Sequence, residues 1–177
     1  MRPHALLLLP LALLSPVLAT TPPTILDAIS NISNNTLSLN SSITTFRSES
    51  GNPLQLLPIV IHSSSLLASI KSGTNTAKAS ANLTFDETVA VAGATQSLVS
   101  NVQSTLSNII AAKPLFNREL VSPVIYLDLE LDKQATDQFS EAVISKVPSA
   151  LQGLAQQIVA PVDTAFDAAL AAYKGQI

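Results

Sequence analysis

Apolar residues recur at steps of three and four along most of the chain, which predicts amphipathic α-helices. The most regular stretch, residues 84–116, opens with Thr84 and has Glu87 three positions later, the pattern of a helix capping box. A second regular stretch follows Pro23, with Thr24 as its expected cap. Its inward positions alternate in steps of four and three, which favours packing against neighbouring helices at a shallow angle. These positions are Ile25, Ile29, Ile32, Thr36, Leu39, Ile43 and Phe46.

Five helical segments are predicted, at about residues 24–46, 54–72, 84–113, 116–147 and 148–173. Residues 47–53 and 73–82 are expected to connect the first three. Pro114 is expected to end the third helix, because the residue before a proline avoids the helical region. Pro123 and Pro161 fall inside the last two segments and are expected to kink or break them.

The segment 127–132, LDLELD, alternates apolar and acidic residues and could instead form an irregular or extended piece. A helical stripe continues through it, so we assign helix. That stripe is Leu120, Val124, Leu127, Leu131 and Ala135. With no rhythm of strands and turns elsewhere, the sequence predicts an all-α fold, an up-and-down bundle of about five amphipathic helices.

The first residues have the composition of a cleaved secretory signal peptide, residues 1–19. A weakly basic start precedes an apolar run too short to span a bilayer, and Val17-Leu18-Ala19 supplies the small-residue cleavage pattern. Residues 20–177 are then expected to form a single helical-bundle domain. Removing Arg2 with the leader leaves 12 acidic against 8 basic residues, which argues against nucleic acid as a partner.

The rest of the composition fits a secreted chain that folds without disulfides, since it contains no Cys. Only 12% of residues are charged, so much of the polar surface is Ser, Thr, Asn and Gln. The ending AFDAALAAYKGQI predicts an amphipathic helix and lacks the pattern of a lipid-anchor signal. We therefore expect an extracellular or cell-wall protein without a lipid anchor or a transmembrane segment.

Catalytic and metal-binding groups are scarce. His62 is the one histidine outside the expected leader, and the serines at 63–65 lie within one turn of the same helix, so their side chains diverge. No G-x-S-x-G elbow accompanies them. Asp128, Glu130 and Asp132 resemble the start of a calcium loop but lack its Gly and Glu positions. We interpret them as a solvated acidic face, and expect no enzyme activity, cofactor or metal.

Four Asn-x-Ser/Thr sequons are candidate N-glycosylation sites in a secreted chain. They are Asn31, Asn34, Asn40 and Asn82. On a helical wheel Asn31 and Asn34 lie opposite the first apolar stripe, and Asn40 lies nearer its flank. Their grouping on one outer face favours modification.

The aromatic residues lie on or beside the apolar stripes, and a bundle core is the plain interpretation. A second interpretation is that the bundle is incompletely filled and accepts an apolar guest, because Ala, Val, Leu and Ile without Trp can leave room between helices. A helix of about 20 residues is roughly 30 Å long, enough for an extended acyl chain. The candidate lining residues are Phe85, Phe116, Tyr126, Phe139 and Phe166.

Three segments resemble the fungal hydrophobic surface-binding proteins, a family that overlaps the antigenic cell-wall galactomannoproteins. They are IIAAKPLF (109–116), VISKVPSALQGLAQQIVAPVDTAFDAALAAY (143–173) and the signal peptide. The resemblance covers about residues 24–173 and includes no catalytic motif. It implies an all-helical secreted domain that adsorbs to hydrophobic surfaces or holds long-chain fatty acids. The chain departs from wall-attached members in lacking a Ser/Thr-rich stalk, which favours simple secretion.

The sequence therefore supports a non-catalytic protein that binds a long-chain fatty acid, another apolar ligand or a hydrophobic surface, with cell-wall polysaccharide as a further candidate partner. The alternative is a glycosylated structural mannoprotein with a fully packed core and no ligand. An elongated apolar void in the structure would separate the two.

Overall fold

The computed structural model describes residues 23–175, and the expected signal peptide lies outside them. Within that part of the chain there are five α-helices, two short 3-10 helices and no strand. The α-helices are α1 (Ile25–Ser48), α2 (Leu56–Ala79), α3 (Phe85–Arg118), α4 (Ser122–Ile144) and α5 (Gln152–Tyr173); the 3-10 helices are η1 (Pro53–Gln55) and η2 (Ser149–Leu151). The predicted all-α bundle is confirmed.

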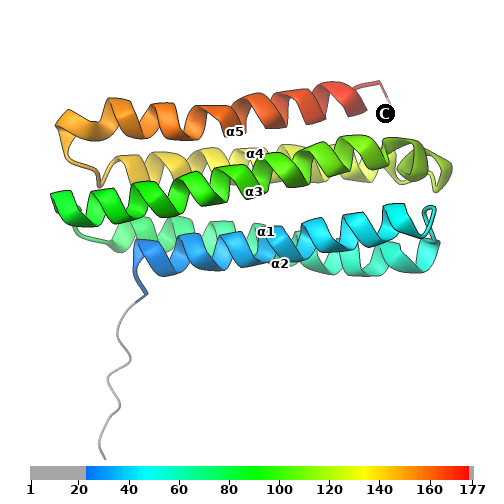
Figure 1. Ribbon diagram of the computed structural model, residues 1–177, viewed down its shortest axis with the longest axis horizontal. Helices are drawn as coiled ribbons and strands as arrows, with labels where there is room; N and C mark the ends of the chain where they lie inside the picture. The colour runs from blue at the N-terminus through cyan, green and yellow to red at the C-terminus, as the bar shows by residue number, and fades with distance from the viewer. Residues whose placement is uncertain (1–22, 176–177) are drawn as a thin grey trace, which may run out of the picture.

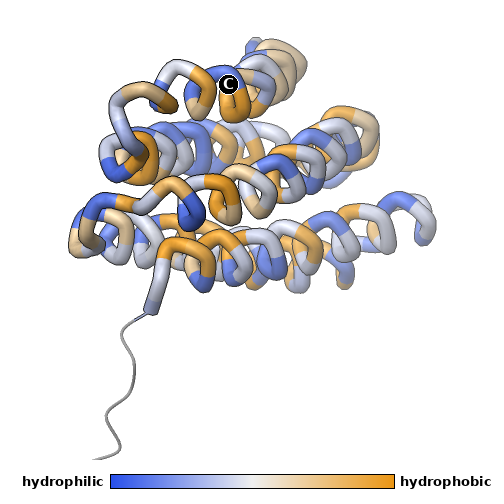
Figure 2. The backbone as a smooth tube through the Cα atoms, turned by 60° about the vertical axis from the view of Figure 1, so that its left-hand side comes forward, coloured by the Kyte–Doolittle hydropathy of each residue, from blue (hydrophilic) through white to orange (hydrophobic). Residues whose placement is uncertain are grey.

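The helices run alternately in opposite directions along one long axis (Figure 1). α1 packs on α2 and α3, α2 also packs on α4, and α5 packs on both α3 and α4. These five pairs close a ring, so each helix turns one face to a common centre. Figure 2 shows hydrophobic residues recurring at intervals along every helix, as that arrangement requires.

The predicted capping box at Thr84 and the predicted cap at Thr24 are both present, and Thr24 also forms a capping box, with Asp27. In α1, Asp27 N–H donates to Thr24 Oγ1 at 3.1 Å, and Thr24 N–H donates to Asp27 Oδ2 at 2.9 Å. The same reciprocal pair joins Thr84 and Glu87 at the start of α3. The predicted inward positions of α1 are all buried, because the stripe faces both α2 and α3.

Three predicted helix boundaries are wrong, and one is the start of the fourth helix: α4 begins at Ser122 and not at about residue 116, which belongs to α3. α2 continues through Gly73 to Ala79, and Gly73 serves close packing instead of a turn. A Cβ there would lie 3.1 Å from both Ile32 Cδ1 and Phe139 Cε2. α3 likewise continues through Pro114 to Arg118. It ends where Leu120 adopts a left-handed φ of 59°.

The predicted proline kinks meet different outcomes. Pro123 lies in the first turn of α4, where a missing N–H costs nothing, so no kink arises from it. Pro161 does lie inside a helix, but α5 continues through it as one element. Segment 127–132 is helical, as assigned.

One face of α2 stays uncovered. The segment Pro53–Ala79 is long and apolar enough to pass a length and composition test for a membrane span, a test that core helices of soluble proteins also pass. α2 packs on α1 and α4 through one side, while Leu57, Val60 and Ile61 are exposed. The apolar residues of α2 therefore divide between two faces, one buried in the core and one exposed on the outer surface.

Candidate functional site: an apolar cavity inside the helix ring

An elongated cavity of about 230 Å³ lies inside the ring. A single water needs only about 10–15 Å³ of such volume, so the space is far larger than a packing defect. All five helices contribute to the wall. The lining includes Ile32, Thr36 and Leu39 of α1; Leu66 and Ile70 of α2; Val91, Val99, Val102 and Leu106 of α3; Leu129, Asp132, Phe139 and Val143 of α4; and Ala155, Ile158, Val162 and Phe166 of α5.

The cavity follows the long axis of the bundle. Its lining on α3 runs from Phe85 to Ile109, which at 1.5 Å per residue corresponds to about 36 Å. This length accommodates an extended chain more readily than a compact ligand.

The mouth lies where α3 and α5 begin. Phe85, Val89 and Leu154 line the cavity yet are more than half exposed, with 64%, 57% and 57% of their surface accessible. A hydrogen bond from Leu83 N–H to Lys146 O, 2.8 Å long, ties the start of α3 to the residues that follow α4. Apolar side chains at an opening favour entry of an apolar molecule.

The opposite end is filled. Phe46 and Phe116 stack with ring centroids 4.9 Å apart, and both are fully buried. Tyr173, also fully buried, donates its hydroxyl to Ile109 O at 2.7 Å. Burial raises the pKa of Tyr173, so this hydroxyl stays protonated and keeps its hydrogen bond.

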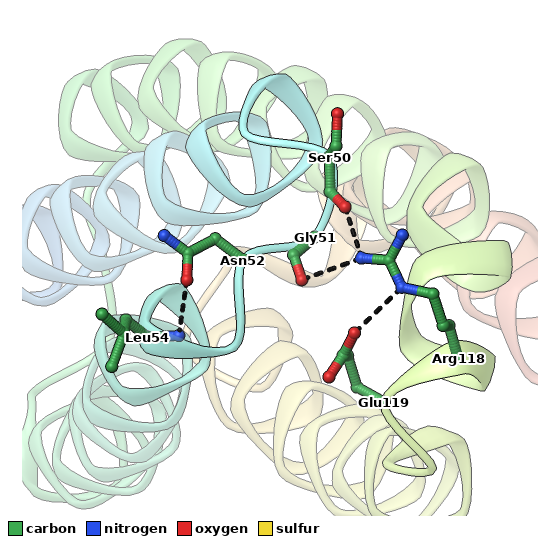
Figure 3. Close-up of polar contacts among 6 residues, drawn as sticks. All are labelled: Ser50, Gly51, Asn52, Leu54, Arg118 and Glu119. Atoms are coloured by element: carbon green, nitrogen blue, oxygen red, sulfur yellow. Dashed lines mark hydrogen bonds and ion pairs between the residues drawn. The ribbon is translucent and has the colours of Figure 1, made fainter.

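The connection between α1 and α2 is fastened across this closed end (Figure 3). Arg118, in the last turn of α3, donates to the carbonyls of Ser50 and Gly51 and pairs with Glu119 at 3.0 Å. Gly51 has a φ of 77°, which favours glycine. These contacts hold the ends of α1 and α3 together around the stacked rings.

Several hydroxyls in the cavity wall donate hydrogen bonds within their own helix. Thr36, Thr88 and Thr105 each donate to the carbonyl four residues earlier in the same helix, at 2.8–2.9 Å. Because these hydrogen bonds are internal, the wall presents mainly methyl groups to the cavity.

Asp132 is the one charged residue among the lining residues. Only 6% of its surface is accessible, and its Oδ1 has no hydrogen-bond partner among the described residues. Burial, reinforced by the charge of Asp128 and opposed by Lys71, raises the pKa of the Asp132 carboxyl to about 8. The prediction of a solvated acidic face is therefore wrong for Asp132, because α4 turns this position inward.

The structure places the candidate lining residues in two groups. Phe85, Phe139 and Phe166 line the cavity. Phe116 belongs to the stacked pair at the closed end, and Tyr126 lies half-buried on α4 outside the lining. Those two positions offer no contact to a molecule inside this cavity.

His62 lies away from the cavity, between α2 and α1. Its Nδ1 is 2.7 Å from Ser42 Oγ, while Ser63 donates instead to Asp128. Among residues 23–175, no carboxylate is hydrogen-bonded to the His62 ring and no cluster of three or more acidic, His or Cys side chains is placed to hold a metal. The arrangement lacks the relay that a nucleophilic serine requires.

Three of the four sequon asparagines are exposed, namely Asn31 and Asn34 on α1 and Asn82 between α2 and α3. Asn40 is half-buried, and its Oδ1 accepts a 2.8 Å hydrogen bond from Asn108 Nδ2 of α3. The outward position predicted for Asn31 and Asn34, and the flanking position of Asn40, agree with this arrangement.

A second apolar feature lies on the outside of the closed end, where α2 and α4 run side by side. We call it the α2/α4 patch: Leu57, Val60 and Ile61 of α2 with Val124, Leu127 and Leu131 of α4, all exposed. The Ser63–Asp128 hydrogen bond shows that these two stretches are adjacent. The stripe predicted to pack the inside of the fourth helix therefore faces outward except at Ala135, because α4 carries two apolar faces.

The sequence profile of the family described as Hydrophobic surface binding protein A matches residues 22–145. Cell wall mannoprotein 1 of Aspergillus fumigatus is 29% identical over 163 residues, 92% of this chain and 56% of that protein. Cell wall mannoprotein 1 of Aspergillus flavus is 30% identical over 148 residues, 84% of this chain and 52% of that protein. The chain thus spans about half the length of these curated relatives.

Solved structures share the fold. The crystal structure of Afmp4p in complex with palmitic acid superposes with a TM-score of 0.80 at 25% identity, covering 85% of this chain and 97% of that one. Ligand binding domain 1 of the Penicillium marneffei MP1 protein, complexed with arachidonic acids, gives a TM-score of 0.74 at 20% identity, covering 83% and 94%. The second likeness bears on the fold alone.

Proposed function

Because the chain belongs to the hydrophobic surface binding protein A family, we propose that it is a non-catalytic binding protein that takes a long-chain fatty acid, or another apolar chain, into the cavity between its helices. The observation that carries the proposal is the cavity itself, elongated, open at one end and lined by uncharged side chains except Asp132. Burial of hydrocarbon there is driven by apolar area removed from water, at about 25 cal/mol per Å². The complex of the similar Afmp4p with palmitic acid supports this assignment.

A matched pair of variants on α3 tests the proposal. Ala92 lines the cavity, whereas Ala90, two residues earlier, is exposed and does not. Ala92→Phe puts a ring into the space that the acyl chain would occupy, and should weaken binding of a fluorescent fatty acid about tenfold or more. Ala90→Phe makes the same substitution on the outer face and should leave binding unchanged.

Mass spectrometry supplies an independent check. Native spectra of the protein from its own host should show the mass of a bound lipid, which disappears on delipidation. Delipidated wild-type protein that takes up no fatty acid would contradict the proposal.

The alternative, a structural mannoprotein with a fully packed core, is not favoured. Such a core would leave no elongated void, whereas this bundle contains one whose lining on α3 runs from Phe85 to Ile109. The stacked rings of Phe46 and Phe116 fill the other end.

A specific observation favours a second activity, adsorption to hydrophobic surfaces through the α2/α4 patch. Large contiguous apolar patches are uncommon on monomeric proteins and mark interaction surfaces. The patch lies outside the filled end, so adsorption through it needs no opening of the bundle and leaves the cavity mouth free.

Paired substitutions separate the patch from the cavity. Leu57→Gln with Leu127→Gln should reduce adsorption to hydrophobic beads while leaving fatty-acid binding intact. Leu26→Gln with Leu37→Gln removes two exposed leucines of α1 outside the patch and serves as the control. Equal loss of adsorption in both double variants would show that the patch has no special part.

We further propose an extracellular or cell-wall location, supported by the cell wall mannoprotein relatives, with N-glycans at Asn31, Asn34 and Asn82. These three side chains are exposed. Asn31 and Asn34 lie on α1, which contributes nothing to the α2/α4 patch, and Asn82 lies three residues before Phe85 at the mouth. Asn40 is a weaker acceptor because of its hydrogen bond to Asn108. Enzymatic removal of N-glycans should lower the mass of the native protein and of its Asn40→Gln variant equally.

A further inference from the structure

Asp132 is placed where an apolar ligand would leave it without a partner. It lies in the middle of α4, nine-tenths buried, in a wall otherwise made of uncharged groups, and its Oδ1 is unpaired. Buried polar atoms in folded proteins are nearly always hydrogen-bonded, so the unpaired Oδ1 leaves an acceptor position open to a molecule in the cavity.

The neighbouring acidic residue provides an internal comparison. Asp128, one turn earlier on α4, accepts a hydrogen bond from Ser63 of α2 and lies outside the lining. Asp128 thus has a structural partner, whereas Asp132 faces the cavity without one. A purely structural account of the acidic pair explains Asp128 and fails for Asp132.

Burial, more than the neighbouring charges, keeps the Asp132 carboxyl protonated at neutral pH. Burial and the charge of Asp128 raise its pKa to about 8, and Lys71 of α2 is the cation that opposes them. The lining contributed by α1, α3 and α5 holds no charged side chain. Lys133 pairs with Asp137 and with Asp167 of α5, outside the lining. A protonated carboxyl has one O–H to donate and still accepts hydrogen bonds.

We propose that Asp132 is the recognition residue for the polar end of the bound molecule: its protonated carboxyl donates a hydrogen bond to the carboxylate of a fatty acid, which therefore enters head first and leaves its hydrocarbon tail toward the mouth. This inference rests on the proposed function. The resulting acid–carboxylate pair shares one proton and carries one negative charge, an arrangement that paired carboxyl groups adopt elsewhere.

The position of Asp132 sets the depth of the head group. Asp132 precedes Ile144, the lining residue at the end of α4 nearest the mouth, by 12 positions, which is about 18 Å along the helix. These roughly 18 Å between Asp132 and the mouth accommodate the part of the acyl chain next to the carboxylate. The far end of the acyl chain then contacts the exposed apolar residues Phe85 and Leu154 at the mouth.

The proposal predicts a pH dependence with a defined sign. Asp132 is neutral below its pKa and donates to the ligand carboxylate; above it two carboxylates would repel. Affinity for hexadecanoic acid should change little between pH 5 and 7 and fall about tenfold between pH 7 and 9. Affinity for hexadecanol should stay nearly constant, because its hydroxyl can donate to the ionised carboxyl.

Two variants at the same position complete the test. Asp132→Asn keeps the shape and a donor but cannot ionise, so hexadecanoic acid should still bind at pH 7 and the loss at pH 9 should disappear. Asp132→Leu removes the donor, so the acid should bind more weakly at pH 7 while methyl hexadecanoate binds at least as well. Glu130→Gln, on the exposed side of α4, is the charge-matched control and should behave as wild type.

The outcomes distinguish this inference from the function on which it rests. If Asp132→Asn keeps the wild-type pH dependence of affinity, that dependence does not come from Asp132 and its assignment is wrong. This conclusion holds even if Ala92→Phe abolishes binding and so supports the proposed function. If no probe binds to any protein, including wild type at pH 5, the proposed function itself is wrong.

Discussion

The two ends of the bundle use similar apolar residues and fill the centre of the ring to different extents. At the closed end Phe46 of α1 and Phe116 of α3 stack, and Tyr173 of α5 is fully buried with its hydroxyl on Ile109 O of α3. At the open end the inward positions are mainly Val, Ile, Leu, Ala and Thr, with Phe85 and Phe139, and a cavity remains. Side-chain volume at a few converging positions, more than overall hydrophobicity, decides where this bundle is solid.

The same comparison explains how rigidity and access are separated. The closed end is fastened by the Tyr173–Ile109 and Arg118–Gly51 hydrogen bonds. The open end has the Leu83–Lys146 bond and an apolar rim. Stability can therefore come from one end of the ring while the other admits a ligand.

The largest expected effect is a difference in stability between two variants, each of which removes a phenylalanine from one end of the bundle. Phe116→Ala removes a fully buried stacked ring and should lower the free energy of unfolding by about 3–5 kcal/mol. Phe85→Ala at the mouth should change it by less than about 0.5 kcal/mol. Urea denaturation of both variants measures this; similar losses would remove the distinction between the ends.

The next effect concerns Asp132 in the lipid-free protein. Its pKa is raised to about 8 in the folded state, so the folded state binds a proton that the unfolded chain releases near pH 4. Stability should therefore be greatest below pH 4 as far as this group is concerned, and decline as pH rises through 8. Asp132→Leu should stabilise the lipid-free protein by about 1–3 kcal/mol at pH 7.

Thermal melts of wild type and Asp132→Leu at pH 5, 7 and 9 check that sign. The gap between the two melting temperatures should widen with pH. A gap that is constant with pH would show that folding does not raise the pKa of Asp132 above that of the unfolded chain.

A smaller effect is expected at Pro161, which interrupts the hydrogen bonds of α5 beside the cavity. Pro161→Ala restores a donor toward Gln157 and should stabilise the protein by roughly 1–2 kcal/mol, less than the ~3 kcal/mol of an interior proline because α5 accommodates it. If α5 moves during ligand entry, the variant should also take up fatty acid more slowly in stopped-flow fluorescence. Wild-type uptake rates together with increased helix content would exclude such a hinge.

The smallest expected effect compares two helical glycines. A Cβ at Gly93 of α3 meets nothing within 4 Å, so Gly93→Ala should stabilise the protein by about 0.5–1 kcal/mol. At Gly73 the added methyl lies 3.1 Å from Ile32 and Phe139, both lining residues, so Gly73→Ala should destabilise and narrow the cavity. Chemical denaturation measures the stability of both variants, and a fatty-acid titration measures their affinity. Equal stability and equal affinity would show that the helices around Gly73 move apart easily to accommodate the methyl group.

Local signals in the sequence predicted much of the scaffold. The Thr24 and Thr84 caps and the inward stripe of α1 were identified because capping and helical periodicity involve neighbours in the chain. Gly73 and Pro114 misled the prediction for the same reason. Both residues weaken isolated helices, but in this protein tertiary contacts carry α2 and α3 past them.

The apolar stripe of α4 shows what helical periodicity cannot predict. Leu127 and Leu131 have helical spacing, as do Leu129, Asp132 and Phe139, and spacing cannot tell which set faces the centre. The helices packed on α4 decide this, and they place Leu127 and Leu131 outside and Leu129 and Asp132 inside. A charged residue at an inward position of an apolar stripe was the available signal for Asp132.

The amino-acid sequence by itself thus determined the helices, most of their caps and the all-α class, since these depend on residues within a few positions of one another. Tertiary structure alone decided that five helices close into a ring, that aromatic rings fill one end and that a cavity remains at the other. The physical reason is that an internal volume depends on side chains from distant segments meeting in one place. The pKa of Asp132 has the same origin, because the burial that raises it exists only when the ring is closed.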